Sequence, residues 1–450
     1  MTHAWQDTTL AEDFSVADAH EDELYAAMDW LIERQDKIEK RLAKRHLKEG
    51  GLVLFDLTSS SFEGVTCPLA KIGYSRDGKP GTLQVNYGLL TDFRGCPLAV
   101  SVFEGNTADP KTLLPQVEKV RNAFGVASLI MVGDRGMISN VQIEAMRAME
   151  GVDWITALKS GAIARLANAG QLQLDLFDER NLLSLTSKDY PGERLVACRN
   201  PELAKLRAAK RKDLIAATER ELQHVAGMVA AGKLKGRDKI GLRVGKVIGK
   251  YKMAKHFDLD IQDEAFSFSV NEKRVAAEAA LDGVYVIRTS AAEAGMSAEA
   301  AVLNYKRLAE VERAFGALKS VDLQVRPIRH RLESRVKAHI FLSMLAYYVQ
   351  WHLAEVLKPL LFADETPAGE RDPVAPARRS AAALAKAHTR RLADGTAAFS
   401  FRGLLTHLAT IVRNTMRPKD AKPGMGTFTL TTEANPKQRQ ALDLAATIAA

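Results

Sequence analysis

Between residues 51 and 160, short apolar runs typical of strands are separated by turns and by stretches with helical spacing of apolar residues. This pattern predicts the element order β-β-β-α-β-α-β. The predicted strands are the apolar runs 52–57, 82–90, 97–103, 128–132 and 152–158. Predicted helices cover 110–124, which begins at Asp109-Pro110 with a cap and a proline, and 139–149. Ahead of these elements, an apolar stripe of helical spacing predicts one helix over 21–48, ended by Gly50-Gly51.

Two aspartates interrupt this apolar pattern at the ends of strands. Asp56 lies near the end of the first run, and Asp134 follows the fourth run in the sequence Gly133-Asp-Arg-Gly136. A strand-terminal aspartate is often only a turn former. If the first and fourth strands are parallel neighbours in a mixed sheet, however, the two carboxylates meet side by side. That is a ribonuclease-H-like arrangement, and it requires a third acid from a later helix.

The stretch 304–320, NYKRLAEVERAFGALKS, is predicted to form that helix. Residues seven apart fall on nearly one face, so Tyr305, Glu312 and Lys319 form a polar stripe. The neighbouring apolar stripe should pack on the sheet, and it consists of Leu308, Val311, Phe315 and Leu318. Glu310 projects about 200° away from Glu312, so only Glu312 is expected to face the aspartates. The alternative is an ordinary amphipathic helix with surface charges.

A large basic insertion, about 165–280, separates the two aspartates from this helix. It is predicted to contain a strand at 171–178 and a long helix at 201–231. Between Arg199 and Lys255 there are 16 Lys or Arg and 5 acids, an excess of 16 − 5 = +11. Glycines among these cations suit contact with phosphates, and Lys246, Lys250 and Lys252 are candidate DNA contacts. A solvated helical face would show the same charge excess.

Charge, cysteine spacing and hydropathy indicate the class of partner and the cellular compartment to expect. The chain has 450 residues, a net charge of +8 and a pI of about 9.2, which favours an anionic partner such as nucleic acid. Cys67, Cys96 and Cys198 form no CxxC pair, so their spacing implies neither a disulfide framework nor a zinc knuckle. No signal peptide or membrane span is predicted, and we expect a cytoplasmic, nucleoid-associated protein.

The predicted organisation has an α/β catalytic core in two parts. We expect an N-terminal helical segment at 1–50, the core at 51–164 and 281–360, the insertion domain at 165–280, and a linker with a C-terminal region at 361–450. The second core part should contain a strand at 282–288 and a buried helix at 335–357. Residues 363–380, rich in Pro, Ala and charge, are predicted to be a linker.

Several motifs resemble one family in the order in which that family carries them. They are FDLTSSSFEG, GYSRDGKPG, FEGNTADP, VGDRGM, DGVYVIRT and Tyr-x6-Glu-x6-Lys, and they cover about 50–360. They resemble the DDE transposases of bacterial insertion sequences, specifically the insertion-sequence-1634 branch of the type-4 superfamily. Only about 50 residues precede the first catalytic strand, and they show no helix-turn-helix pattern; a truncated or mis-started copy is one interpretation.

The resemblance implies a function and assigns residues to it. Asp56, Asp134 and Glu312 would be the catalytic acids and would hold two Mg²⁺ or Mn²⁺ ions. Tyr305 and Lys319 would contact transposon-end phosphates. The family's arginine position holds Leu308, and Arg307, one residue earlier, is the candidate for the same contact with DNA.

The expected reaction is cleavage of element-end DNA, followed by attack of the freed 3′-hydroxyl on target DNA. The expected partner is double-stranded DNA, bound by a homodimer. A nuclease that cuts without joining, or a decayed element that only binds DNA, is the alternative.

Overall fold

The computed structural model describes residues 8–173, 176–320, 323–365, 373–375, 379–419 and 426–449. The chain divides into two compact units. Unit 1 comprises Met1–Thr156, Leu303–Arg371 and Pro376–Ala450, and unit 2 comprises Ala157–Val302 and Asp372–Ala375. In the described part of the chain, no helix is long and apolar enough to cross a membrane. The domain boundaries predicted at 50, 164, 280 and 360 stay a prediction.

Unit 1 is built on a mixed sheet with the strand order β4-β3-β1-β5-β6, and β2 also pairs with β3. Its strands are β1 (Gly51–Ser61), β2 (Lys71–Ile72), β3 (Leu83–Asp92), β4 (Pro97–Glu104), β5 (Leu129–Val132) and β6 (Val152–Ala157). β3 is antiparallel to both β1 and β4, whereas β1, β5 and β6 run parallel. The predicted parallel neighbours, the first and fourth apolar runs, are therefore confirmed, with Leu54 opposite Val132.

Strand β1 is longer than its apolar run predicts. Its polar end continues the ladder with β3 as far as the pair Ser61–Gln84. The hydroxyls in this segment are buried and find partners inside the protein, as in the 2.9 Å hydrogen bond between Ser60 Oγ and Tyr87 Oη. Burying a hydroxyl costs little when it is hydrogen-bonded. The sequence TSSS is therefore part of the strand.

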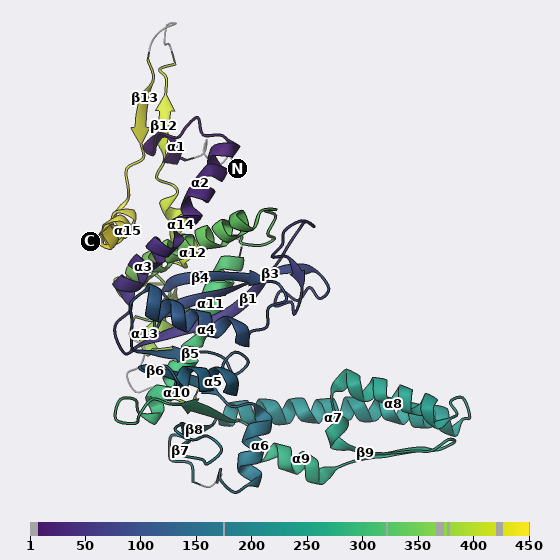
Figure 1. Cartoon of the computed structure of the whole chain (residues 1–450). Helices are drawn as coiled ribbons and strands as arrows, with labels where there is room; N and C mark the ends of the chain where they lie inside the picture. Colours follow the sequence, from purple (N-terminus) through teal and green to yellow (C-terminus); the bar gives the residue numbers. More distant parts are fainter. Residues whose placement is uncertain are drawn as a thin grey trace. The chain divides into compact units, whose positions relative to one another are not determined.

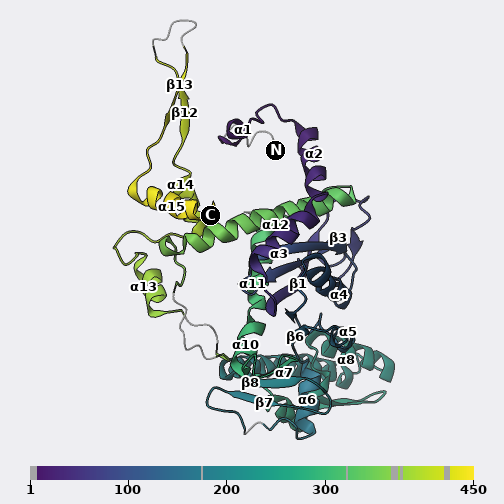
Figure 2. The ribbon, with the colours of Figure 1, turned by 60° about the vertical axis from the view of Figure 1, so that its left-hand side comes forward.

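Alternate residues of β1 serve the two faces of the sheet. Val53, Phe55 and Leu57 point into a core that also contains residues of α4 (Pro110–Glu118), the π-helical turn that follows it (Lys119–Ala123), and α5 (Asn140–Arg147). The helix α11 (Leu308–Lys319) lies against β1, and the Phe315 ring packs edge-on against Tyr87. The long helix α12 (Glu333–Val356) packs against β4 and against α2 (Glu21–Ile32), and Figure 2 shows α2 beside α12.

The remaining helices of unit 1 come from the two ends of the chain. The single helix predicted over 21–48 is wrong, because the segment forms two helices that meet at Glu33–Arg34. The Arg34 guanidinium stacks on Trp30 and donates to the Trp30 carbonyl, which satisfies a C-terminal group of the first helix. These terminal elements are α1 (Leu10–Asp13), α2 (Glu21–Ile32), α3 (Gln35–His46), a 3₁₀ turn (Lys358–Leu360), α13 (Ala381–Thr389), α14 (Phe401–Leu408), β12 (Arg413–Met416), β13 (Phe428–Thr431), α15 (Pro436–Ala446) and a second 3₁₀ turn (Thr447–Ala449). Much of the predicted linker, 366–372 and 376–378, lies outside the described residues.

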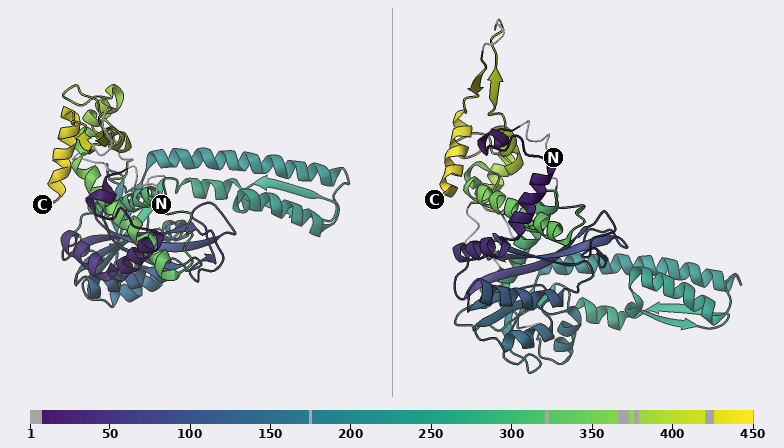
Figure 3. Two further views of the ribbon diagram at one scale, coloured as in Figure 1. Left: turned by 90° about the horizontal axis from the view of Figure 1, so that it is seen from above. Right: turned by 45° about the horizontal axis from the view of Figure 1, so that its top comes forward.

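Unit 2 contains an antiparallel β7-β8-β11 sheet and a long arm. Figures 1 and 3 show the helices α7 and α8 side by side along the arm, next to the β9–β10 hairpin. The helix predicted over 201–231 is confirmed as α7, which begins after the capping residue Asn200. The strand predicted at 171–178 is absent from the described residues of that stretch. The elements of unit 2 are α6 (Ser160–Asn168), β7 (Leu182–Leu185), β8 (Arg194–Arg199), α7 (Pro201–Ala230), α8 (Arg237–Tyr251), a 3₁₀ turn (Ala254–His256), β9 (Phe257–Ile261), β10 (Phe266–Val270), α9 (Glu272–Ala279) and β11 (Val284–Thr289).

Candidate active site

Asp56 lies in the middle of β1, just beyond the point where its parallel neighbour ends. β5 stops at Val132, opposite Leu54, while β1 continues to pair with β3 on its other side. The side chain of Asp56 therefore emerges on the face opposite Phe55 and Leu57, next to the edge of β1 along which β5 no longer pairs. The Leu57 amide donates to Asp56 Oδ1 at 2.8 Å and fixes the carboxylate.

Asp134 lies in the turn that follows β5. The Gly136 amide donates to its Oδ2 at 3.1 Å, and the Tyr305 hydroxyl donates to its Oδ1 at 3.3 Å. Gly133 begins this turn, and a Cβ there would lie 3.0 Å from the Ile138 side chain, which would have to shift by a few tenths of an ångström. Asp134 itself is exposed, so its carboxylate is available to a ligand.

The stretch 304–320 does not form the continuous helix that the sequence predicts. The helix α10 (Ala298–Lys306) ends before Arg307, and α11 begins at Leu308. The Glu310 amide bonds the Arg307 carbonyl at 2.8 Å, which is the tighter three-residue spacing of a turn. Within α11 the predicted face is correct: Val311, Phe315 and Leu318 are buried.

The three acids line one cavity of about 660 Å³. Asp56 comes from β1, Asp134 from the turn after β5, and Glu312 from α11. The complete lining is Asp56, Leu57, Thr58, Arg76, Asp109, Asp134, Met137, Tyr305, Lys306, Leu308, Ala309, Glu312 and Phe315. Carboxylate oxygens are the donors that hard divalent cations such as Mg²⁺ prefer, so this donor set fits such an ion.

Burial and the neighbouring acids change the protonation of this site. Burial, reinforced by the charges of Asp134 and Glu312, raises the pKa of Asp56 from its ordinary 3.8 to about 7. Several carboxylates in one poorly solvated cavity destabilise one another's ionised forms until a cation binds among them. The site therefore has the electrostatic character of a cation site.

The cavity also contains an arginine and a fourth acid, Arg76 and Asp109, for which the sequence predicted no role. Arg76 forms an ion pair with Asp109, and both side chains line the cavity. Arg76 comes from the turn GYSRDGKPG and Asp109 from the motif FEGNTADP, so both were among the motifs that resemble the family. Nothing in the local sequence of either motif predicts that the two side chains meet.

Lys319 is turned into the protein. Its Nζ donates to Thr58 Oγ1 at 2.7 Å, to the Ser59 carbonyl at 2.6 Å and to Asp77 Oδ1 at 2.8 Å. Arg326 shares Asp77 Oδ1 at 2.7 Å. Although burial opposes it, hydrogen bonding from Lys319 holds the pKa of Asp77 below its ordinary value. All three donor positions of the Lys319 ammonium thus meet protein acceptors.

Glu310 and Arg307 point away from the cavity. Glu310 forms an ion pair with Arg313, and its Cβ packs on the turn at Gly95. Arg307 donates to the Phe93 carbonyl at 3.2 Å and lies over the Phe93 ring. Neither residue lines the cavity that contains Glu312.

The three candidate lysines of the insertion lie at the end of α8 and just after it. Lys246 and Lys252 are exposed. Lys250 is also exposed, but its Nζ lies 2.6 Å from Glu221 Oε1 on α7. Its charge is therefore partly balanced within the arm.

A comparison with family models finds a match to the transposase DDE domain over residues 50–349, two thirds of the chain. The chain belongs to the transposase DDE-domain family. The matched range contains Asp56, Asp134 and Glu312. Among curated proteins, none matches this DDE-family chain.

Among solved structures, this DDE-family chain is similar to the piggyBac transposase in a synaptic complex with hairpin DNA. The sequence identity is 7%, the TM-score is 0.33, and the alignment covers 68% of this chain. The chain spans about half, 48%, of the length of that protein.

Proposed function

We propose that this chain is a transposase that cuts the ends of a mobile element and joins the freed 3′-hydroxyl to target DNA. The observation that carries the proposal is the cavity lined by Asp56, Asp134 and Glu312. These acids come from parts of the sequence that are far apart, so the sheet and α11 must both form before the cavity exists. Membership of the DDE-domain family supports the same reaction class.

The acids are proposed to hold two divalent ions, Mg²⁺ or Mn²⁺. Such ions, when bound, activate the attacking oxygen and stabilise the departing one in an in-line displacement at phosphorus. Asp56 and Asp134 supply carboxylates from the sheet, and Glu312 supplies one from α11. Tyr305 holds Asp134 in position through its hydroxyl. Arg76, held by Asp109, provides a positive charge within the same cavity for a phosphate.

We infer a ribonuclease-H-like core from the strand order. Three antiparallel strands, β4, β3 and β1, are followed by β5 and β6, which run parallel to β1. The motif order supports the insertion-sequence type-4 superfamily and its insertion-sequence-1634 branch. A cytoplasmic, nucleoid-associated homodimer on DNA remains the proposed working form.

The arm of unit 2 is the proposed second DNA contact. Its exposed cations, among them Lys246 and Lys252, suit the backbone of a duplex and need no base contact. Lys319 is less suited to the phosphate role that the family resemblance implies, because its ammonium already has three protein acceptors. We propose that it positions α11 against β1.

Cleavage and strand transfer with DNA carrying the inverted repeats that flank the gene test this function. With Mg²⁺, the wild-type chain should nick at the repeat ends and then join them to a target plasmid. Asp56→Asn, Asp134→Asn and Glu312→Gln should each abolish cleavage but retain DNA binding. Glu310→Gln is the matched control and should keep both steps, because Glu310 lies outside the cavity.

The outcomes separate the candidate functions. Cleavage without joining would assign the chain to the nucleases. Binding without cleavage in the wild type would indicate a decayed element. Cleavage that survives in Asp56→Asn or Glu312→Gln would show that the acids have been assigned wrongly.

A further inference from the structure

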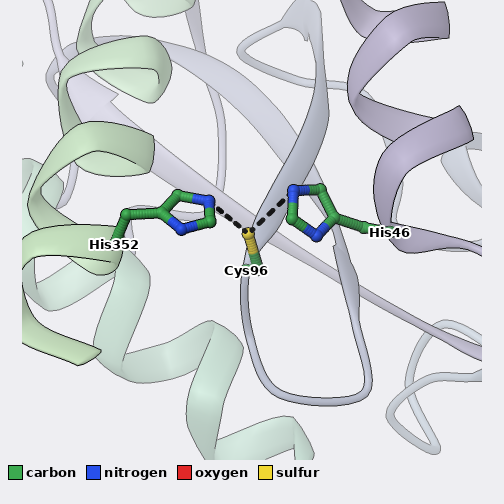
Figure 4. A group of neighbouring side chains, drawn as sticks. All are labelled: His46, Cys96 and His352. Atoms are coloured by element: carbon green, nitrogen blue, oxygen red, sulfur yellow. Dashed lines mark hydrogen bonds between the residues drawn. The ribbon is translucent and has the colours of Figure 1, made fainter. Parts of the chain in front are cut away.

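Three side chains with nitrogen or sulfur donors converge in unit 1, away from the acidic cavity. His46 is the last residue of α3, Cys96 lies directly before β4, and His352 is on α12. Figure 4 shows the two imidazoles turned toward Cys96 Sγ from opposite sides. Each Nε2 atom lies 3.9 Å from Sγ, and the three donor atoms all lie within 4.8 Å of one another.

These separations are close to those of a metal site. Typical bond lengths of about 2.3 Å to sulfur and 2.0–2.1 Å to nitrogen give a sulfur–nitrogen separation of roughly 3.5 Å in a tetrahedral site. The same bond lengths give roughly 3.8 Å for a trigonal arrangement. The observed 3.9 Å distances therefore need only a small contraction. His46 and His352 are only partly buried, so their rings can rotate by the amount required.

Two of the three supporting segments, α3 and the turn before β4, are held in place independently of any ion. Glu39 on α3 is fully buried, accepts from the Val100 amide of β4 at 3.0 Å and pairs with Lys119. The Cys96 amide donates to Asp92 Oδ1 at 3.0 Å, and the thiol is fully buried. Such preorganisation reduces the entropy lost when a ligand binds.

A fourth position can be filled by an oxygen. The Tyr348 hydroxyl lies 2.9 Å from His46 Nε2, close enough to bind the ion or to hold a water ligand. The donor set then contains one sulfur, two imidazole nitrogens and one oxygen. Thiolate and imidazole favour zinc, whereas the all-oxygen cavity of Asp56, Asp134 and Glu312 favours Mg²⁺.

We propose that His46, Cys96 and His352 bind one zinc ion that joins α3 and α12 across the β3–β4 turn. The Cys96 thiol loses its proton when the sulfur–zinc bond forms, and the proton passes to solvent. The ion binds the folded chain but finds no such arrangement in the unfolded chain, so binding stabilises unit 1. The role is structural and does not depend on the proposed transposase reaction.

Arg94 opposes this binding to a limited extent. Its Nη2 lies 3.1 Å from His46 Nδ1, a position where a zinc-bound imidazole carries a hydrogen. The same guanidinium is already bound to Asp92 at 2.7 Å and 2.8 Å. Rotation of the His46 ring thus costs one contact of Arg94 and leaves its charge paired.

Zinc retention by the full-length chain tests the proposal. The purified protein is loaded with Zn²⁺, dialysed with a weak chelator, and assayed for metal content. Wild type should retain about one equivalent, and Cys96→Ser should lose it. Cys67→Ser and Cys198→Ser are matched controls, because these two residues are also buried cysteines. Glu312→Gln should retain zinc, which excludes binding in the acidic cavity.

Two further measurements cover the case in which Cys96→Ser folds poorly. Co²⁺ in place of zinc should give a thiolate charge-transfer band in wild type and in both control variants. His352→Gln changes a partly exposed ligand and should weaken zinc binding by about tenfold or more in a chelator competition. Wild type without stoichiometric zinc, or equal retention in folded Cys96→Ser and wild type, would overturn the proposal.

Discussion

The raised pKa of Asp56 makes the stability of the metal-free protein depend on pH. In the unfolded chain an aspartate ionises near its ordinary 3.8, whereas in the folded chain Asp56 ionises near about 7. The folded state therefore holds a proton that the unfolded state has lost, and stability falls as pH rises between these two values. Asp56→Asn removes this loss because the amide does not titrate.

The magnitude follows from the two pKa values. Over the full interval the ionised carboxylate costs at most about 4 kcal/mol. Between pH 5 and pH 8, the same linkage predicts that wild type loses at most about 2.5 kcal/mol of stability relative to Asp56→Asn. Asp56 retains some exposure, so a loss of about 1–2 kcal/mol is expected.

Urea unfolding of both proteins at pH 5 and pH 8, with EDTA present, measures this difference. Added Mg²⁺ at pH 8 should stabilise wild type and leave Asp56→Asn nearly unchanged, because the variant lacks a proposed ligand. Asp134→Asn should also reduce the loss of stability at pH 8, because removing the Asp134 charge lowers the pKa of Asp56. If the stability difference between Asp56→Asn and wild type is the same at both pH values, the ionised Asp56 carboxylate does not destabilise the folded protein, which contradicts the prediction.

Three other predictions test the remaining side chains. Glu312→Gln should eliminate Mg²⁺-dependent cleavage and Glu310→Gln should leave it near wild type; the reverse pattern in a cleavage assay would mean that α11 presents its other face. Joint Lys246→Ala and Lys252→Ala changes should reduce the log–log salt slope of DNA binding by roughly two, whereas adding Lys250→Ala should contribute less because of Glu221. Changing Lys37 and Lys40 together controls for net charge, and an equal effect there would favour a solvated arm. Lys319→Met should lower stability by about 1–3 kcal/mol, because Asp77 loses a buried donor, and should leave the salt slope unchanged. A slope reduced by about one would restore Lys319 to the DNA contacts.

The sheet and the position of the two aspartates were predictable because both depend on local pattern. Apolar runs of strand length separated by helical periods indicate where β1 and β5 lie, whereas their parallel pairing was a condition of the prediction that the structure then confirmed. The face of α11 was predictable for the same reason, since turning it over would expose Val311 and Phe315. These features need no knowledge of which distant side chains meet.

The helix boundaries were less predictable because they depend on distant contacts. No Pro or Gly stands at Arg307, yet α10 ends there and the guanidinium reaches the Phe93 carbonyl, 214 residues away in sequence. The polar end of β1 was missed because the partner of Ser60, Tyr87, lies on another strand. The His46, Cys96 and His352 cluster was also invisible, since its members share no short spacing.

The contacts of Lys319 give the seven-residue spacing of Tyr305, Glu312 and Lys319 a structural role, which is to hold Glu312 in position. The break at Arg307 leaves all three residues able to reach the core, but each reaches a different part of it. Tyr305 donates to Asp134 beyond β5, and Lys319 donates to Thr58 and Ser59 on β1. The two ends of this segment are therefore tied to the two chain segments that carry the aspartates. Glu312 lies between these ties, so a shift of the whole segment 305–319 that would carry it out of the cavity must break hydrogen bonds at both ends.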